Sequence, residues 1–196
     1  MRSLVFLLEE QSIEEVLKVL LPQILTENVR CQFLAQGGKA TLEKVIPSKL
    51  RGWNTPDTQF VIAQDKDAND CMRLKEKLRT LAIEGGKPEA LIRIVCTELE
   101  SWFLGDLNAV GLAYNTNISG IENKALYRDP DKIANAKQEL KRIVPEYRQI
   151  DGSRRIAQYM DIGENRSHSF HVFVDGVRKM CGITNSDQGD HNNANI

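Results

Sequence analysis

The first apolar run of the chain is LVFLL, residues 4–8, and it leads directly into Glu9 and Glu10. Five consecutive apolar residues are typical of a strand that is buried on both faces, because a solvated face would require polar residues at alternate positions. Two acidic residues then stand where such a strand ends. This stretch predicts a buried parallel strand with carboxylates at its carboxyl end.

Similar apolar runs recur along the first half of the chain, with helical patterns between them. They predict strands at 3–8, 29–35, 59–64 and 91–96. The helical spacing of apolar residues predicts amphipathic helices at 13–26, around 42–46 with a break near Pro47, and at 68–83. Ser12 and Glu15 match the N-cap and partner of a capping box for the first of these helices. Strands that alternate with helices indicate an α/β fold, a mainly parallel sheet with helices on both faces.

The pattern changes after about residue 115. Asp129 and Pro130 predict the start of a helix that ends at Pro145, and two further helices are predicted at 153–160 and 168–181. The segment from Thr184 onward is polar and has no apolar residue to anchor it, as in disordered tails. We therefore predict an α/β core at 1–115, a C-terminal helical extension packed on it at 116–183, and a disordered tail at 184–196.

Composition excludes several classes of protein. A chain of 196 residues can bury a core of its own, and 41% hydrophobic and 27% charged residues exclude a disordered or collagen-like chain. The formal charge of −1 gives no general attraction to nucleic acid or membranes. The four cysteines form no CxxC pair, which argues against a zinc site. The apolar run that stops at Glu9 is too short for a signal peptide or a membrane span, so we expect a cytoplasmic protein.

Acidic residues follow three of the four apolar runs: Glu9 the first, Asp65 and Asp67 the third, and Glu98 and Glu100 the fourth. Ligands of open parallel sheets bind just beyond the carboxyl ends of the strands. Close carboxylates repel one another unless a cation neutralises them, and oxygen ligands suit Mg²⁺ or Mn²⁺. We predict these five residues as metal ligands. The alternative is that they cap and stabilise the turns in which they lie.

Phosphate recognition requires positive charge, and four residues of the extension are candidates for it: Arg154, Arg155, Arg166 and His168. The alternative is that the arginines belong to a solvated helix surface and that His168 only begins a helix. The chain has no GxxxxGK[ST] or GxGxxG motif, which argues against direct hydrolysis of ATP.

Glu9 after a buried strand, with the D-x-D of Asp65 and Asp67 after a later strand, looks like the Toprim pattern of topoisomerases, primases and overcoming-lysogenization-defect nucleases. The chain also resembles, over roughly 3–182, a bacterial family with a Toprim-like core, domain of unknown function 4276. The stretches that carry this likeness are LLEEQS (7–12), QDKDANDC (64–71), ELESWFLGDL (98–107), DPDKI (129–133) and NRSHSF (165–170).

The resemblance implies that Glu9 acts as general acid/base or ligand and that Asp65 and Asp67 hold Mg²⁺. Glu10 is a departure, because Toprim proteins usually have glycine after the first glutamate. The resemblance also implies an anti-phage defence nuclease that acts with an ATP-binding-cassette-like ATPase. We expect a magnesium-dependent nuclease acting on DNA or RNA. Two alternatives are a non-catalytic, metal-binding partner subunit of an ATPase and a nucleotide- or phosphate-binding regulator. Homo-oligomerisation is left open.

Overall fold

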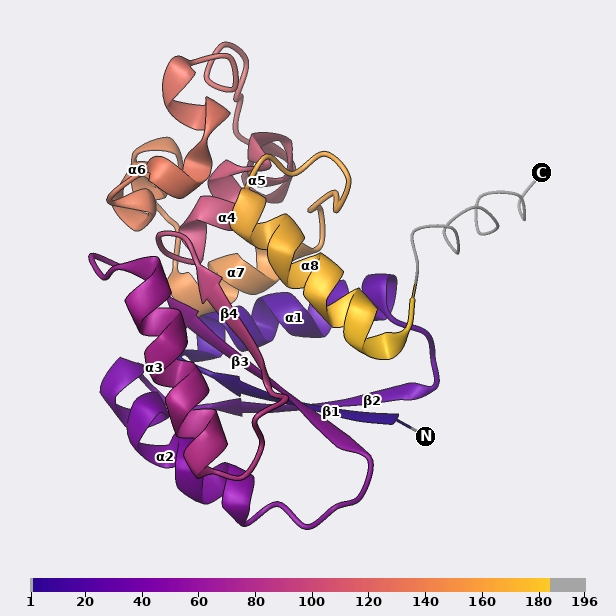
Figure 1. Ribbon diagram of the computed structural model, residues 1–196. Coiled ribbons are helices and arrows are strands. Elements are labelled where there is room, and N and C mark those ends of the chain that lie inside the picture. Colours follow the sequence, from indigo (N-terminus) through magenta and orange to yellow (C-terminus); the bar gives the residue numbers. More distant parts are fainter. Residues whose placement is uncertain (1, 184–196) are drawn as a thin grey trace, which may run out of the picture.

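The computed structural model describes residues 2–183, and its centre is a four-stranded sheet (Figure 1). The strands are β1 (Arg2–Leu8), β2 (Val29–Ala35), β3 (Thr58–Asp65) and β4 (Leu91–Val95). Their order is β2-β1-β3-β4, and every neighbouring pair is parallel. The four predicted strands and the parallel sheet are therefore confirmed.

Helices cover both faces of the sheet. Side chains along each strand point alternately to opposite faces, so a strand that is apolar throughout places apolar side chains on both. Leu4, Phe6 and Leu8 of β1 pack into the core on the side of α1 (Gln11–Ile24). Val5 and Leu7 pack into the core on the side of α2 and α3. These two helices span Lys39–Arg51 and Cys71–Glu84. The arrangement confirms the predicted α/β fold and is consistent with a Toprim-like core.

The register of the sheet brings the ends of β1, β3 and β4 together. Leu8 of β1 lies beside Ala63 of β3, and Asp65 at the end of β3 lies beside Val95 of β4. The pairing continues beyond the strands, since the Asp67 N–H donates to the Thr97 carbonyl oxygen at 2.9 Å. The residues that follow β1, β3 and β4 therefore share one edge of the sheet.

The second half of the chain is helical. It contains α4 (Glu100–Leu104), α5 (Leu107–Tyr114), α6 (Ala136–Ile143), α7 (Gln149–Ala157) and α8 (His168–Cys181), with short 3₁₀ turns at Ala125–Arg128 and Pro130–Lys132. The bounds of α8 match the predicted 168–181. Asp129 and Pro130 instead begin a 3₁₀ turn, and α6 starts only at Ala136. Within residues 2–183, none of the helices is both long and apolar enough to cross a membrane.

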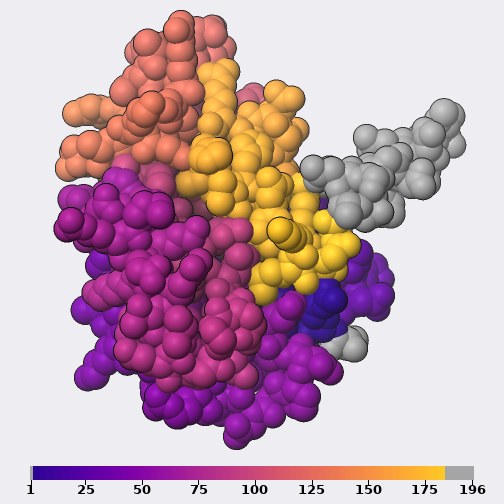
Figure 2. All heavy atoms as spheres, in the orientation of Figure 1, coloured from indigo at the N-terminus to yellow at the C-terminus, as the bar shows by residue number. Residues whose placement is uncertain are grey.

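The helical extension shares a core with the sheet. Ile156 of α7 and Phe170 of α8 belong to the same buried cluster as Leu4 and Trp102. Figure 2 shows the atoms of α8, in yellow, against those of the N-terminal half, in magenta. The division at residue 115 stays a prediction, and the predicted disordered tail, 184–196, lies outside the described residues.

Two local predictions at helix ends were wrong. Ser12 does not cap α1, which begins at Gln11. Its hydroxyl is buried against α7 and accepts from Gln149 Nε2 at 3.4 Å. The contact with α7 thus overrides the local capping signal. Pro47 does not end α2, which continues to Arg51. A proline removes only one hydrogen bond of the helix, and continuation buries Leu50 completely in the core.

Gly152 of α7 occupies a position with no room for a side chain. An added Cβ would lie 2.5 Å from the Tyr147 ring and 2.7 Å from the Tyr114 hydroxyl oxygen. We expect Gly152→Ala to lower the free energy of unfolding by about 1–3 kcal/mol, because overpacking outweighs the helix preference of alanine. Gly163→Ala is the control, since its nearest neighbouring atom is at an ordinary 3.4 Å. Equal urea midpoints for the two variants would contradict this packing of α7.

Candidate functional site

Glu9 lies at the edge of the sheet directly after β1. Its Oε2 accepts a hydrogen bond from the backbone N–H of Asp65 at 3.2 Å, which ties the end of β1 to the end of β3. Burial raises the pKa of Glu9, and the charges of Asp67 and Glu10 act in the same direction, whereas the Asp65 N–H and the charge of Lys39 oppose the shift. The carboxyl group of Glu9 is therefore more basic than that of an ordinary surface glutamate.

Asp65 is the last residue of β3, and its Oδ2 accepts from the Leu99 N–H at 3.3 Å. Burial raises the pKa of Asp65 well above its ordinary value, and the neighbouring charges of Glu9 and Glu100 raise it further. Within residues 2–183, no lysine or arginine forms an ion pair with this carboxylate. Asp65 thus lies among other carboxyl groups, and no basic side chain of the described residues pairs with it.

Asp67 follows in the loop after β3, with a left-handed φ of 49° that aspartate tolerates better than most residues. Its side chain is 47% exposed, and Oδ2 accepts from Lys39 Nζ at 2.8 Å. Lys39 was not among the site residues predicted from the sequence. The only signal for it was its place directly after Gly37 and Gly38, where a loop enters a helix.

Glu98 and Glu100 make contacts with the helical extension. Glu98 Oε2 accepts from the Lys137 N–H at 2.9 Å, in the first turn of α6. Glu100 is buried, and its Oε1 accepts from the Tyr147 hydroxyl at 3.0 Å. Burial raises the pKa of Glu100. Both residues therefore help to hold the extension on the core, and Glu100 remains close enough for its charge to raise the pKa of Asp65.

Glu10 follows Glu9 directly, and its carboxylate accepts a hydrogen bond from Gln149 Nε2 of α7. The side chain of Glu10 thus contacts the helical extension. Glu9, Glu10, Gln64 and Asp65 together line a small recess between the ends of β1 and β3. Of these four residues, Glu9 and Asp65 are the pair joined by a hydrogen bond across the strand ends.

The donor atoms at this edge fit a hard divalent cation, since they are carboxylate oxygens with too few positive partners. The present positions of these oxygens are less suited to binding a metal ion. Among the described residues 2–183, no group of three or more His, Cys, Asp or Glu side chains is placed so as to hold a metal ion. Asp67 is engaged with Lys39. A site made of Glu9, Asp65 and Asp67 therefore requires the Asp67 side chain to leave Lys39.

Residues 8–178 match the family model described as Domain of unknown function (DUF4276). The chain belongs to this family. No curated protein and no solved structure matches it. All the strand-end carboxylates lie within the matched residues.

The four predicted phosphate-binding residues of this DUF4276 chain lie on its helical extension. Arg154 forms an ion pair with Asp151 at 2.7 Å, and the Arg155 guanidinium lies 4.5 Å from the centre of the Tyr114 ring. Arg166 Nη1 donates to the Glu122 carbonyl oxygen at 2.9 Å, and His168 is the exposed first residue of α8. None of the four donates to a strand-end carboxylate within residues 2–183, where Lys39 makes such a contact instead.

Two of the stretches that suggested the DUF4276 family, DPDKI and NRSHSF, hold the segment after β4 in place. Asp131 accepts from the Ser167 hydroxyl at 2.6 Å and from the Ser169 N–H at 2.7 Å. The Ser169 hydroxyl in turn accepts from Trp102 Nε1 at 3.0 Å and from the Cys96 N–H at 3.2 Å. This buried network supports the backbone next to the carboxylates.

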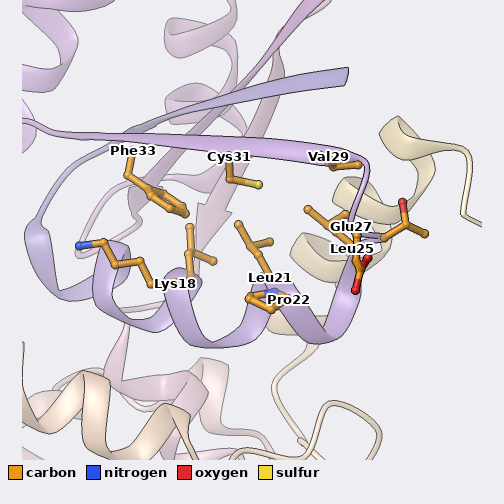
Figure 3. A pocket seen from close by; sticks show the side chains of 10 residues that line it. Lys18, Leu21, Pro22, Leu25, Glu27, Val29, Cys31 and Phe33 are labelled. Atoms are coloured by element: carbon orange, nitrogen blue, oxygen red, sulfur yellow. The ribbon is translucent and has the colours of Figure 1, made fainter. Parts of the chain in front are cut away.

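A separate hollow of the DUF4276 chain lies between α1 and β2 (Figure 3). Figure 3 shows Cys31 and Phe33 pointing from β2 toward α1, with Leu21 and Pro22 opposite. The lining is mostly apolar, and burial raises the pKa of the Cys31 thiol to about 11, which leaves it unreactive at neutral pH. The residues that line this hollow include no pair of carboxylates like that of Glu9 and Asp65. The strand-end edge is therefore the better candidate for a metal-binding or catalytic site.

Asp65 allows a test of the electrostatics of the edge. Because its pKa is raised in the folded chain, its contribution to stability is present below the unfolded pKa of about 4 and is lost as the pH rises through the folded pKa. Asparagine does not ionise, so Asp65→Asn does not lose stability in this way as the pH rises. Its amide oxygen can still accept from the Leu99 N–H. In buffer without divalent metal, we expect the variant to gain on the order of 1 kcal/mol at pH 8 and less at pH 5. Thermal unfolding at both pH values measures this. A variant less stable than the wild type at pH 8 would support a purely structural role for Asp65.

Proposed function

We propose that this chain is a divalent-metal-dependent phosphodiester hydrolase that cleaves DNA or RNA in the cytoplasm. The observation that carries the proposal is the meeting of Glu9 and Asp65 at the ends of two neighbouring strands. The Asp65 N–H donates to the Glu9 carboxylate. Burial raises the pKa of both groups, the charge of Glu9 raises that of Asp65 further, and the charge of Asp67 raises that of Glu9. A carboxylate pair of this kind favours a bound cation, which relieves the repulsion.

Each residue of the edge has a role in the proposed reaction. Glu9, Asp65 and Asp67 would hold Mg²⁺ or Mn²⁺, and Glu100 could add a ligand, since its charge already acts on Asp65. Glu98 would first have to leave the Lys137 N–H. When bound, the metal polarises a phosphoryl oxygen and lowers the pKa of water. The Glu9 carboxylate has two oxygens, so that it could bind the ion through one and take the proton of the attacking water through the other.

The basic residues support the proposed substrate class, whereas the proposed partner follows from the resemblance. Lys39 supplies positive charge beside the edge, and Arg154, Arg155, Arg166 and His168 would extend this to a nucleic acid that also contacts the helical extension. An ATP-binding-cassette-like ATPase partner and a role as effector in anti-phage defence follow from the resemblance of the chain to defence-associated nucleases.

The test of the proposed function is nucleic acid cleavage by the purified chain. Single- and double-stranded DNA and tRNA are incubated with the protein and Mn²⁺, Mg²⁺ or a chelator, with and without a candidate ATPase partner. Cleavage that needs metal and disappears in Asp65→Asn supports the proposal. Cleavage that persists in this variant, or no cleavage under any of these conditions, would contradict it.

A second candidate function is a non-catalytic, metal-binding subunit of an ATPase complex. The observation that favours it is the use of three acidic residues for structural contacts: Glu10 with Gln149, Glu98 with Lys137 and Glu100 with Tyr147. Carboxylates engaged in this way are less available for a second metal ion. Binding of Mn²⁺ without cleavage of any nucleic acid would distinguish this function from the first.

A further inference from the structure

Lys39 is placed at the edge of the sheet by the loop between β2 and α2. Gly37 and Gly38 have φ values of 72° and 129°, which residues with a Cβ rarely adopt. The Gly38 N–H donates to the Glu9 carbonyl oxygen at 2.8 Å. Because Lys39 follows immediately as the first residue of α2, its backbone is fixed beside the end of β1.

The ammonium group of Lys39 faces carboxylates from three elements. Its Nζ donates to Asp67 Oδ2 at 2.8 Å. Partial burial disfavours its charge, but the bond to Asp67 and the charges of Asp67, Glu9 and Glu43 outweigh this and raise the pKa of Lys39. Glu43 has its own closer partner, Lys77, at 2.6 Å. Lys39 therefore serves mainly as the counter-ion of the strand-end carboxylates.

Other lysines near this edge have different partners. Lys66 Nζ donates to the backbone carbonyl oxygen of Asp67, at 3.2 Å, and not to its carboxylate. Lys137 Nζ donates to the side chain of Gln149. Within residues 2–183, Lys39 is thus the lysine whose ammonium binds one of the carboxylates of Glu9, Asp65 and Asp67.

The ion pair between Lys39 and Asp67 is suited to an exchange of partners, in which Asp67 gives up the ammonium for a metal ion. The two side chains are 29% and 47% exposed, and ion pairs this accessible to water contribute little to stability. A divalent cation bound by Asp67 competes with the ammonium for the same oxygen. Lys39 then has free N–H donors beside the metal position, where a substrate phosphate would bring a new anionic partner.

We propose that Lys39 is the phosphate-binding residue of the site, held by Asp67 until a metal ion takes that carboxylate and then transferred to the substrate phosphate. The inference rests on the proposed function, because it assumes a metal ion at Asp67 and a phosphodiester substrate. It adds a residue of α2 to a site otherwise made of strand-end carboxylates, and it requires that the same side chain oppose metal binding and favour substrate binding.

The test compares Lys39→Met with Lys77→Met, which removes a neighbouring lysine–glutamate pair. We expect Lys39→Met to bind Mn²⁺ as tightly as the wild type or about 3–10-fold more tightly, because a competing cation is gone. Its affinity for a fluorescein-labelled single-stranded oligodeoxynucleotide, measured with Mn²⁺ present, should fall about 10–100-fold, the loss expected for one charge-assisted hydrogen bond. Lys39→Arg should restore most of this affinity, and Lys77→Met should match the wild type in both assays.

Oligonucleotide affinity that is unchanged in Lys39→Met, or equally reduced in Lys77→Met, would overturn the inference. A loss of Mn²⁺ affinity in Lys39→Met would also overturn it, because the residue would then support the metal site and not compete with the ion. The proposed function fails by a different result. A wild type that binds Mn²⁺ and the oligonucleotide without cleaving any nucleic acid would refute hydrolysis, while the Lys39 comparison would still decide the role of that residue.

Discussion

Glu9→Gln is expected to lower Mn²⁺-supported cleavage of nucleic acid by about 10²–10⁴-fold, the usual cost of losing a general base. Glutamine keeps the shape of the side chain, and its amide oxygen can still accept from the Asp65 N–H. It cannot take a proton from water, and it is a weaker metal ligand than a carboxylate. Initial rates on single-stranded DNA, double-stranded DNA and tRNA measure the effect, with circular dichroism to verify the fold.

Glu10→Gln is the matched control for this result. The two glutamates are adjacent and border the same recess, but the Glu10 carboxylate accepts from Gln149 of α7. We expect its replacement to change the cleavage rate by less than about 10-fold, because a contact with the extension is altered and no proton acceptor is lost. An equal loss of activity in both variants would mean that the roles assigned to Glu9 and Glu10 are wrong.

Loss of metal binding is the second large effect that we expect. Asp65→Asn and Asp67→Asn should each weaken Mn²⁺ binding by at least about 100-fold, because each replaces a charged oxygen ligand by a neutral amide. Asparagine is preferred to alanine at position 67, since it tolerates the left-handed φ of 49°. Isothermal titration calorimetry measures the affinity.

Asp151→Asn is the control for these two variants, because Asp151 is an exposed aspartate of α7 that pairs only with Arg154 in the described chain. It should bind Mn²⁺ like the wild type. Unchanged Mn²⁺ affinity in both the Asp65 and Asp67 variants would contradict the metal site. Unfolding of both would instead favour the alternative that these aspartates brace the turn after β3.

The sheet could be predicted from the sequence because short, uninterrupted apolar runs between turn residues are typical of buried strands. LVFLL at 4–8 matches β1, and FVIA at 60–63 lies within β3. The apolar residues that located β2 and β4 are interrupted by Arg30, Gln32 and Arg93. The proximity of Glu9 and Asp65 followed from parallel strands whose carboxyl ends share an edge. Helix ends were harder to predict. The capping signal at Ser12 is local, but α7, more than a hundred residues away, decides where that side chain lies.

The partners of the site residues could not be predicted, because they depend on distant contacts. Lys39 and Asp67 lie 28 residues apart, and Glu10 and Gln149 lie 139 apart. No periodic pattern encodes such a pair. The acids after β4 illustrate the same limit. Their position predicted that Glu98 and Glu100 lie near the edge, but not that they accept hydrogen bonds from the helical extension.

The central claim is that Glu9 and Asp65, with Asp67, form one divalent-metal site at the carboxyl edge of the sheet. Anomalous diffraction from crystals grown with Mn²⁺ tests it most directly, since the ion and its ligands are located without reference to activity. The account predicts one strong peak at this edge, with carboxylate oxygens of both Glu9 and Asp65 at about 2.0–2.3 Å. Saturating Mn²⁺ that gives no peak at this edge, or a peak only at another position, would contradict it.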